Sequence, residues 1–472
     1  MPSLMRNSFF NMLYQLVLLL VPLASAMYVS RVVMPEGLGE IATAENLVSY
    51  FTALAPLGIP AYGLREVAKV RGDQRARSRI FSELVLLNFA STLLFLGVYA
   101  TCVLVFFDGA VPALYLIFGS LIVANCLNVE WLFSGLERYV FISVRGMVVR
   151  IASLILTLVF VKGPDDVLIY AGVTCLATVA NYLVNVVCLH GQVKFTLRGI
   201  APFRHLRPVL VLAGTIVLFS IYTKVDITML GVFCASSVVA YYAYAYKAEE
   251  IAKMLCVSLT SVYLPRLSYE FIHDRKEFSR LMRQSMMLNI WISAPMAMGV
   301  FMLAPHIVPL LFGEAFLPAV LTLQMFSGLI IAKSIGQIIY QVTIATGNER
   351  FQLVAYSVGV AVNIALNFAL IPMLQQNGAV VATVLTEIVL DVVLAFYIKE
   401  HMCLAIQLRF WLSLFGGLVA TGAVLLLCGA LISDHLLCTG VSVVLSAITY
   451  GAVGIACKNE TAVLLLRRIF RR

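Results

Sequence analysis

Residues 71–106 read RGDQRARSRIFSELVLLNFASTLLFLGVYATCVLVF, a basic segment followed by a long apolar run. A helix that crosses a lipid bilayer needs about 20 consecutive apolar residues, and residues 82–106 meet that length. The same criterion predicts thirteen further runs, bounded by charged residues, Gly or Pro. The fourteen predicted spans are 9–33, 41–62, 82–106, 112–134, 141–161, 167–189, 208–233, 237–262, 284–311, 317–344, 351–372, 377–398, 410–431 and 437–456.

The composition requires lipid as part of the solvent. Of the 472 residues 61% are hydrophobic and only 12% are charged, with a mean hydropathy of +0.97. A soluble chain of this length carries about twice that share of charge. We therefore expect an all-α membrane protein with about fourteen transmembrane helices.

The net charge of +9 does not indicate a nucleic-acid partner, because the basic residues fall in short gaps between apolar runs. The ten cysteines show no Cys-x-x-Cys or Cys/His ligand spacing, which predicts buried apolar thiols rather than disulfides or metal ligands. Arg6, Leu16–Leu23 and Ala24–Ala26 resemble a signal peptide. Apolar residues continue to Met34, which favours an uncleaved first span.

The basic residues alternate strictly between the two sides of the predicted spans. If the N-terminus is cytoplasmic, 26 of the 33 basic residues lie in cytoplasmic segments, and the external gaps hold only Arg31 and Lys162. Under the positive-inside rule this pattern predicts that both termini are cytoplasmic. The basic run Arg65–Arg79 either sets this topology, which we favour, or binds lipid headgroups.

A weak internal repeat divides the chain. A shift of 201 residues aligns residues 62–88 with 263–289, and a shift of 212 aligns 135–139 with 347–351. Each element recurs six spans later, so both copies face the same side, as in a parallel repeat with a pseudo-two-fold axis along the membrane normal. We predict a six-helix bundle in residues 1–200, a second in 201–403, and two added helices with a basic tail in 404–472.

Span 237–262 carries the most informative intramembrane charges. At 100° per residue a stripe about 100° wide gathers two tyrosines and three charged residues, and Lys247 lies about 60° beyond it. The members of the stripe are Tyr242, Tyr246, Glu249, Glu250 and Lys253. Charges inside a span are costly unless they face each other or water, so the stripe predicts the lining of a cavity, or alternatively a self-neutralised helix contact.

Other spans add further polar positions. Lys224 and Asp226 are two residues apart and point to different sides of their helix, so they cannot simply neutralise each other. Glu387 and Asp391 lie one turn apart, as in a proton-coupling pair, although Lys333 is an equally good structural partner for them. Arg150 and Glu130 also fall inside spans.

Two features bear on mechanism. Pro56 and Pro60 predict a broken or kinked second span, and broken helices are typical of the moving or binding parts of transporters. The sequence contains no Walker, HExxH or GxSxG motif, and every external gap is shorter than about 15 residues. We therefore expect neither an enzyme nor a nucleotide cofactor.

Several short motifs resemble the polysaccharide-export flippases, which share a superfamily with the multidrug and toxic-compound extruders. These motifs are SRVVMPEGLG (30–39), Tyr50-Phe51, GLREVA (63–68), EWLFSGLE (130–137), Lys224-Val-Asp226 with Leu230-Gly231, and TGNER (346–350). Their order and spacing extend over most of the chain and thin out after about residue 400. Val33-Met34 departs from the Leu-Gly that is usual in the family.

The resemblance implies a V-shaped pair of bundles that alternately expose a cavity for an undecaprenyl-diphosphate-linked oligosaccharide in a bacterial inner membrane. Expected partners are that donor, membrane lipids, and a polysaccharide polymerase with other assembly proteins. The candidate substrate-binding residues are Lys224, Lys247, Lys253, Lys333, Arg31, Arg150, Tyr242 and Tyr246. The candidate coupling or ion-pair residues are Asp226, Glu249, Glu250, Glu387, Asp391 and Glu130.

Two other functions compete with this expectation. A multidrug or cation antiporter of the same fold should have a more acidic and more aromatic cavity than five basic intramembrane residues provide. A membrane-embedded polymerase should carry a large external loop, which no gap here provides.

Overall fold

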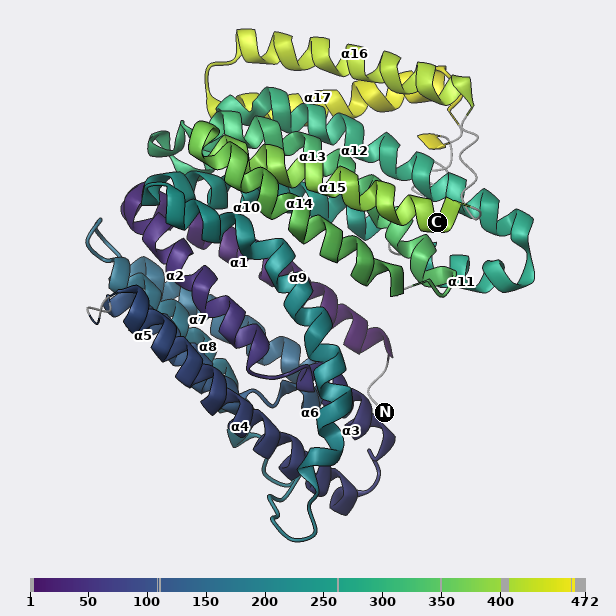
Figure 1. Cartoon of the computed structure of the whole chain (residues 1–472). Coiled ribbons are helices and arrows are strands. Elements are labelled where there is room, and N and C mark those ends of the chain that lie inside the picture. Colours follow the sequence, from purple (N-terminus) through teal and green to yellow (C-terminus); the bar gives the residue numbers. More distant parts are fainter. Residues whose placement is uncertain are drawn as a thin grey trace. The chain divides into compact units, whose positions relative to one another are not determined.

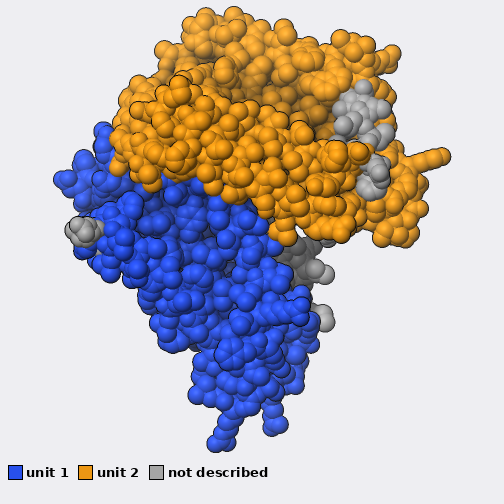
Figure 2. Space-filling view, viewed as in Figure 1, with its two compact units in different colours: residues 1–228 blue, residues 229–472 orange. Residues whose placement is uncertain are grey.

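The fourteen predicted spans all correspond to helices in the computed structural model, which describes residues 4–107, 109, 112–260, 263–348, 350–399, 407–459 and 461–462 (Figure 1). The basic tail beyond Thr461 and Ala462 lies outside the described residues. The chain consists of two compact units, and the boundary between them lies between residues 228 and 229 (Figure 2).

The first unit holds residues 1–228. Its helices pack in pairs that are distant in sequence, such as α1 on α7 and α5 on α8. The elements are α1 (Leu4–Val32), α2 (Met34–Leu54), α3 (Ile59–Lys69), α4 (Gln74–Phe106), α5 (Ala113–Ala124), η1 (Asn125–Leu127), α6 (Glu130–Gly135), α7 (Tyr139–Phe160), α8 (Val167–Val187), η2 (Pro202–His205) and most of α9 (Leu206–Phe233).

The second unit holds residues 229–472. Its elements are α10 (Ser236–Thr260), α11 (Tyr263–His273), α12 (Arg275–Phe312), η3 (Glu314–Phe316), α13 (Ala319–Ala345), α14 (Arg350–Leu374), α15 (Gln376–Ile398), α16 (Leu408–Leu431) and α17 (His435–Ala456). The last two helices lie side by side and pack on α12 (Figure 1). At that contact Tyr450 Oη donates to the Trp291 carbonyl at 2.9 Å.

The division between the units differs from the expected boundaries near residues 200 and 403. α9 remains with the first unit as far as Thr228, because Asn46 and Tyr50 of α2 bond to the Thr228 hydroxyl at 2.7 and 2.9 Å. α16 and α17 belong to the second unit, because their aromatic side chains Phe410 and Tyr450 pack on Trp291.

Thirteen of the described helical segments are long and apolar enough to cross a membrane. The remaining predicted span corresponds to α10, which carries Lys247, Glu249, Glu250 and Lys253 within seven residues. The chain is therefore a multi-span membrane protein, and four of the charged residues in its predicted spans lie on α10.

The predicted break in the second span is confirmed. α2 ends at Leu54 and α3 begins at Ile59, and the left-handed backbone of Leu57 (φ 48°) and Gly58 (φ 78°) joins them. The hydroxyl of Ser91 donates to the freed Ala55 carbonyl at 2.5 Å. A broken helix is tolerated within a membrane when a neighbouring helix satisfies the freed backbone in this way.

The fourth span is also broken, which the sequence did not predict. α5 ends at Ala124, and α6 begins at Glu130 after the 3-10 turn η1. The Asn88 amide donates to the Asn125 carbonyl at 3.1 Å. Asn88 and Ser91 of α4 therefore support both breaks from one face of one helix.

The internal repeat has a structural counterpart at the helix caps. Asp73 begins α4 by accepting from the backbone amides of residues 75 and 76 at 2.8 and 3.1 Å. Asp274, its partner at a shift of 201 residues, begins α12 with the same two distances to residues 276 and 277. A short helix, α3 or α11, precedes each long helix. Both copies thus use the same N-cap chemistry.

Candidate functional site

Helix α10 packs on α12, α13 and α15 within the second unit, and the tyrosines of its predicted stripe contact residues of α13 and α15. The rings of Tyr242 and Tyr246 are parallel, with centroids 6.4 Å apart, as their spacing of four residues predicts. Phe326 of α13 contacts both rings, at 5.2 and 5.7 Å. The Tyr242 hydroxyl lies 3.3 Å from Thr383 Oγ1 on α15. These contacts fix the two tyrosines at a junction of three helices.

Two lysines flank Tyr246. Lys253 lies seven residues, about two helical turns, after Tyr246 on α10, and its Nζ atom is 5.6 Å from the centroid of the Tyr246 ring. The Nζ atom of Lys333 on α13 is 5.8 Å from the same centroid. Both distances are within the reach of cation–π attraction. Two positive charges therefore lie beside one aromatic ring, although they come from helices about 80 residues apart in the sequence.

Carboxylates offset these lysines. Glu250 Oε1 lies 3.9 Å from Lys253 Nζ. Glu249 is fully buried, and neither of its carboxylate oxygens has a hydrogen-bond partner among the described residues. Glu249 and Glu387 of α15 both act electrostatically on Lys253 and Lys333. The result is a mixed-charge group at the α10–α13–α15 junction, which we name the α10 cluster: Tyr242, Tyr246, Glu249, Glu250, Lys253, Lys333 and Glu387.

Asp391 lies one turn beyond Glu387 and approaches α13 closely. A Cβ atom at Gly336 would clash with the Asp391 carboxylate, so the glycine permits this approach. Glu387 and Asp391 also interact with each other electrostatically. The structure thus brings together six of the seven charged residues that the sequence places inside spans of the second unit, all except Lys247.

Lys247 has a different environment. Its side chain is exposed, and its Nζ atom lies 4.5 Å from the centroid of Tyr244, whose ring contacts Phe312 and Phe316. It therefore neighbours Tyr244 rather than Tyr246.

Lys224 and Asp226 lie in the first compact unit, whereas Lys247 and Lys333 lie in the second. The charge of Glu45 acts on Lys224, and Asn46 donates to the Lys224 carbonyl at 3.2 Å. Asp226 is buried and acts electrostatically on Tyr50. Sequence reasoning missed Glu45 and Asn46; the signal available was an acid and an amide inside the apolar span 41–62.

Two of the other candidates in the first unit, Arg31 and Glu130, have local partners. Arg31 donates to the Met27 carbonyl in the last turn of its own helix, and Arg150 is exposed on α7. Glu130 forms an ion pair with the buried Arg145, which the sequence had placed in a cytoplasmic segment. The remaining guanidinium nitrogens of Arg145, Nε and Nη1, have no hydrogen-bond partner among the described residues.

In the part of the chain that the structure describes, no three His, Cys, Asp or Glu side chains come together as a metal-ligand set. The chemistry available at the α10 cluster is therefore that of paired ammonium and carboxylate groups beside stacked aromatic rings. Such a group can bind an anion through the lysines and an apolar sugar face through the half-buried Tyr246.

Known proteins with similar sequences and folds are membrane transporters. The chain is 24% identical over 384 residues to a putative O-antigen transporter of Shigella dysenteriae, a match that covers 77% of this chain and 92% of that protein. The fold is similar to that of the lipid II flippase MurJ in an inward closed conformation, with a TM-score of 0.72, 15% identity and coverage of 95% and 99%.

A multidrug resistance MATE family transporter in an inward-facing conformation is also similar in fold, with a TM-score of 0.63, 15% identity and coverage of 80% and 93%. The sequence profile of the family described as polysaccharide biosynthesis protein matches residues 4–270, more than half of the chain. The order of the helices and the resemblance of the motifs agree with this match. The chain therefore belongs to the polysaccharide biosynthesis protein family.

Proposed function

We propose that this protein flips an undecaprenyl-diphosphate-linked oligosaccharide across a bacterial inner membrane by alternating access, for the synthesis of a cell-surface polysaccharide. One observation carries the proposal: Lys253 and Lys333 lie beside Tyr246 at the junction of α10, α13 and α15 in the second unit. The similarity to an O-antigen transporter supports the same class of substrate.

The α10 cluster suits a diphosphate next to a sugar. Ammonium groups on flexible stems can follow a phosphate as it moves, and they cost less within a membrane when an anion is present. The 3.9 Å contact between Lys253 and Glu250 is long for an ion pair, so a phosphate oxygen can compete with that carboxylate for the lysine. The half-buried ring of Tyr246 offers an apolar face to a sugar, and the buried ring of Tyr242 packs parallel to it.

Lys247 of the second unit is a further proposed phosphate ligand. Lys224 of α9, which lies beside Glu45 and Asn46, is proposed as a phosphate-binding residue of the first unit. Arg31 and Arg150 are proposed to guide the anionic donor, and Asp226, Glu249, Glu387 and Asp391 to balance the lysines or bind a coupling ion while the donor is absent.

The distribution of basic residues supports a cytoplasmic position for both termini. A polysaccharide polymerase and other assembly proteins are proposed partners on the far side of the membrane, where the released donor is consumed. We propose no enzymatic step in this chain.

A multidrug or cation antiporter is the second candidate, and a specific observation favours it: Glu249, Glu250, Glu387 and Asp391 outnumber Lys253 and Lys333 at the junction. The fold similarity to a multidrug transporter is compatible with either function.

Complementation distinguishes the two functions. The gene is expressed in a strain that lacks its own lipid-linked oligosaccharide flippase, and surface polysaccharide is measured together with the export of a cationic dye. Restored polysaccharide without dye export supports the flippase. Dye export without polysaccharide supports the antiporter and contradicts our proposal.

A further inference from the structure

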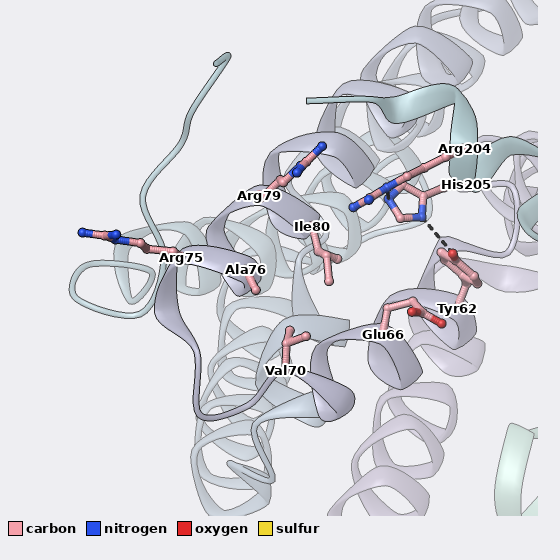
Figure 3. Close-up of a pocket in the computed structure, with 9 residues that line it drawn as sticks. All are labelled: Tyr62, Glu66, Val70, Arg75, Ala76, Arg79, Ile80, Arg204 and His205. Atoms are coloured by element: carbon pink, nitrogen blue, oxygen red, sulfur yellow. Dashed lines mark hydrogen bonds between the residues drawn. The ribbon is translucent and has the colours of Figure 1, made fainter. Parts of the chain in front are cut away.

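A second group of basic residues lines a pocket of about 670 Å³ within the first unit, away from the α10 cluster in sequence (Figure 3). Its walls come from α3, the first turns of α4 and the 3-10 turn η2. Arg79, Arg204 and His205 lie together on one side, Tyr62 and Glu66 lie opposite, and Arg75 points away (Figure 3). The pocket is large enough for a phosphate with further headgroup atoms.

A buried carboxylate holds the basic wall in place. Glu83, one turn after Arg79, has a fully buried side chain and accepts from the Ala201 amide at 2.8 Å. It also accepts from Arg79 Nε at 3.1 Å and from Arg204 Nη2 at 2.6 Å. A carboxylate bound to two guanidinium groups fixes their positions, so the wall is organised before any ligand arrives.

His205 extends this arrangement to the opposite wall. Its Nε2 atom lies 2.8 Å from the Glu83 carboxylate, and its Nδ1 atom lies 2.8 Å from the Tyr62 hydroxyl. Because an ionised carboxylate can only accept, the ring donates through Nε2. The bond to Tyr62 then ties α3 to η2 across the pocket.

The two arginines keep donors for a ligand. Arg79 uses only Nε, so both of its terminal nitrogens lack a hydrogen-bond partner among the described residues. Arg204 donates to Glu83 through Nη2 and likewise retains Nη1. Each side chain is 46% exposed. Glu66, the acid that faces them, is already paired with Lys69 at 2.8 Å and Arg65 at 3.4 Å. The pocket therefore has an excess of positive charge.

The internal repeat shows that this pocket is not a requirement of the fold. Arg280 is the counterpart of Arg79 at a shift of 201 residues, and it pairs with the neighbouring Glu277 at 2.6 Å. Gln284 stands where the first copy has Glu83. The second copy thus has the arginine without the buried acid, so the anchored guanidinium pair belongs to the first copy alone.

We propose that the pocket binds the phosphate of a lipid headgroup. The planar guanidinium groups of Arg79 and Arg204 match phosphate oxygens through paired hydrogen bonds. The surroundings of the pocket indicate that this phosphate belongs to a lipid. Helix α3 exposes both Leu64 and the basic residues Arg65 and Lys69, which is typical of a helix at the membrane surface. A bulk anionic phospholipid and a polyprenyl diphosphate present the same phosphate chemistry.

Native mass spectrometry of the purified full chain tests the proposal. Phosphatidylglycerol, phosphatidylcholine and undecaprenyl diphosphate are offered separately, and the lipid retained by wild type is compared with R79Q/R204Q and the matched control R280Q. Loss of two charge-assisted contacts should weaken retention at least about tenfold in R79Q/R204Q, with R280Q unchanged. Retention of phosphatidylglycerol assigns the site to membrane lipid; retention of undecaprenyl diphosphate alone assigns it to the donor.

Equal retention by wild type and R79Q/R204Q overturns the proposal. The arginines also neutralise Glu83, so the double variant leaves a buried charge without its partners and is at risk of unfolding. The triple variant E83Q/R79Q/R204Q removes that buried charge as well, and its lipid retention is compared with wild type in the same way. The readout is binding rather than transport, so the result is independent of the proposed flippase function.

Discussion

Replacing Lys333 with Gln removes one of the two positive charges beside Tyr246 while keeping a side chain of similar length. In wild type Lys253 and Lys333 lie 5.6 and 5.8 Å from the ring centroid, and Glu249, Glu250 and Glu387 lie within their electrostatic reach. In K333Q the same carboxylates face a single lysine. An anionic donor therefore loses one ligand and meets stronger repulsion from the uncompensated acids.

A hydrogen bond to a charged group contributes about 1.5–3 kcal/mol. Loss of about 2 kcal/mol raises the dissociation constant about 30-fold. K333R should recover part of the affinity, because it restores the charge with a different geometry. The assay is the binding of a fluorescent undecaprenyl-diphosphate sugar to the protein in detergent, measured by fluorescence anisotropy.

Lys399 provides the matched control, since its Nζ atom also lies over an aromatic ring, Phe396 at 4.7 Å, but at the exposed end of α15. K399Q should bind the donor like wild type. An unchanged dissociation constant in K333Q, with K333R also unchanged, would refute a phosphate at the α10 cluster.

Four further outcomes are expected. K247A, E249A and K253A should each reduce transport in complementation while the protein still inserts; full complementation by all three would make the α10 stripe structural. Single cysteines that replace Glu314, Asp434 or Asp108, the last of which lies outside the described residues, should react with an external impermeant thiol reagent. Labelling of the cysteine at position 434 from the cytoplasm alone would contradict the topology. E130A should destabilise the fold by about 3 kcal/mol in thermal unfolding, because it leaves Arg145 buried and unpaired, whereas E137A, whose partner Arg71 is exposed, should have little effect. D73A should cost about 1 kcal/mol through the lost N-cap of α4, and an unchanged melting temperature would argue against the cap.

The sequence predicted the helices well, because membrane spans are set by local composition. Every predicted span overlaps a helix, and the two prolines near Gly58 predicted the break between α2 and α3. The break between α5 and α6 escaped prediction, since no proline marks it and its freed backbone is satisfied by Asn88 from another helix. α12 begins at Arg275, nine residues before the predicted span, because a helix can continue into water beyond the apolar run.

The charge partners were less accessible to sequence reasoning. Helical periodicity correctly placed Tyr242, Tyr246 and Lys253 on one face of α10, because their spacing is local. Pairings such as Glu130 with Arg145, Glu45 with Lys224 and Glu83 with His205 depend on how separate helical segments pack against one another. The same limit applies to the bonds between α9 and α2 through Thr228.

The most direct test of the flippase function is transport by the purified protein in liposomes. A fluorescent undecaprenyl-diphosphate oligosaccharide is incorporated in the inner leaflet, and its exposure on the outside is followed by quenching with an impermeant reagent. We predict that wild type exposes the donor and that the K224Q/K247Q/K333Q variant does so much more slowly. Absence of flipping by wild type, together with uptake or export of a cationic dye in the same liposomes, would contradict the account and favour the antiporter.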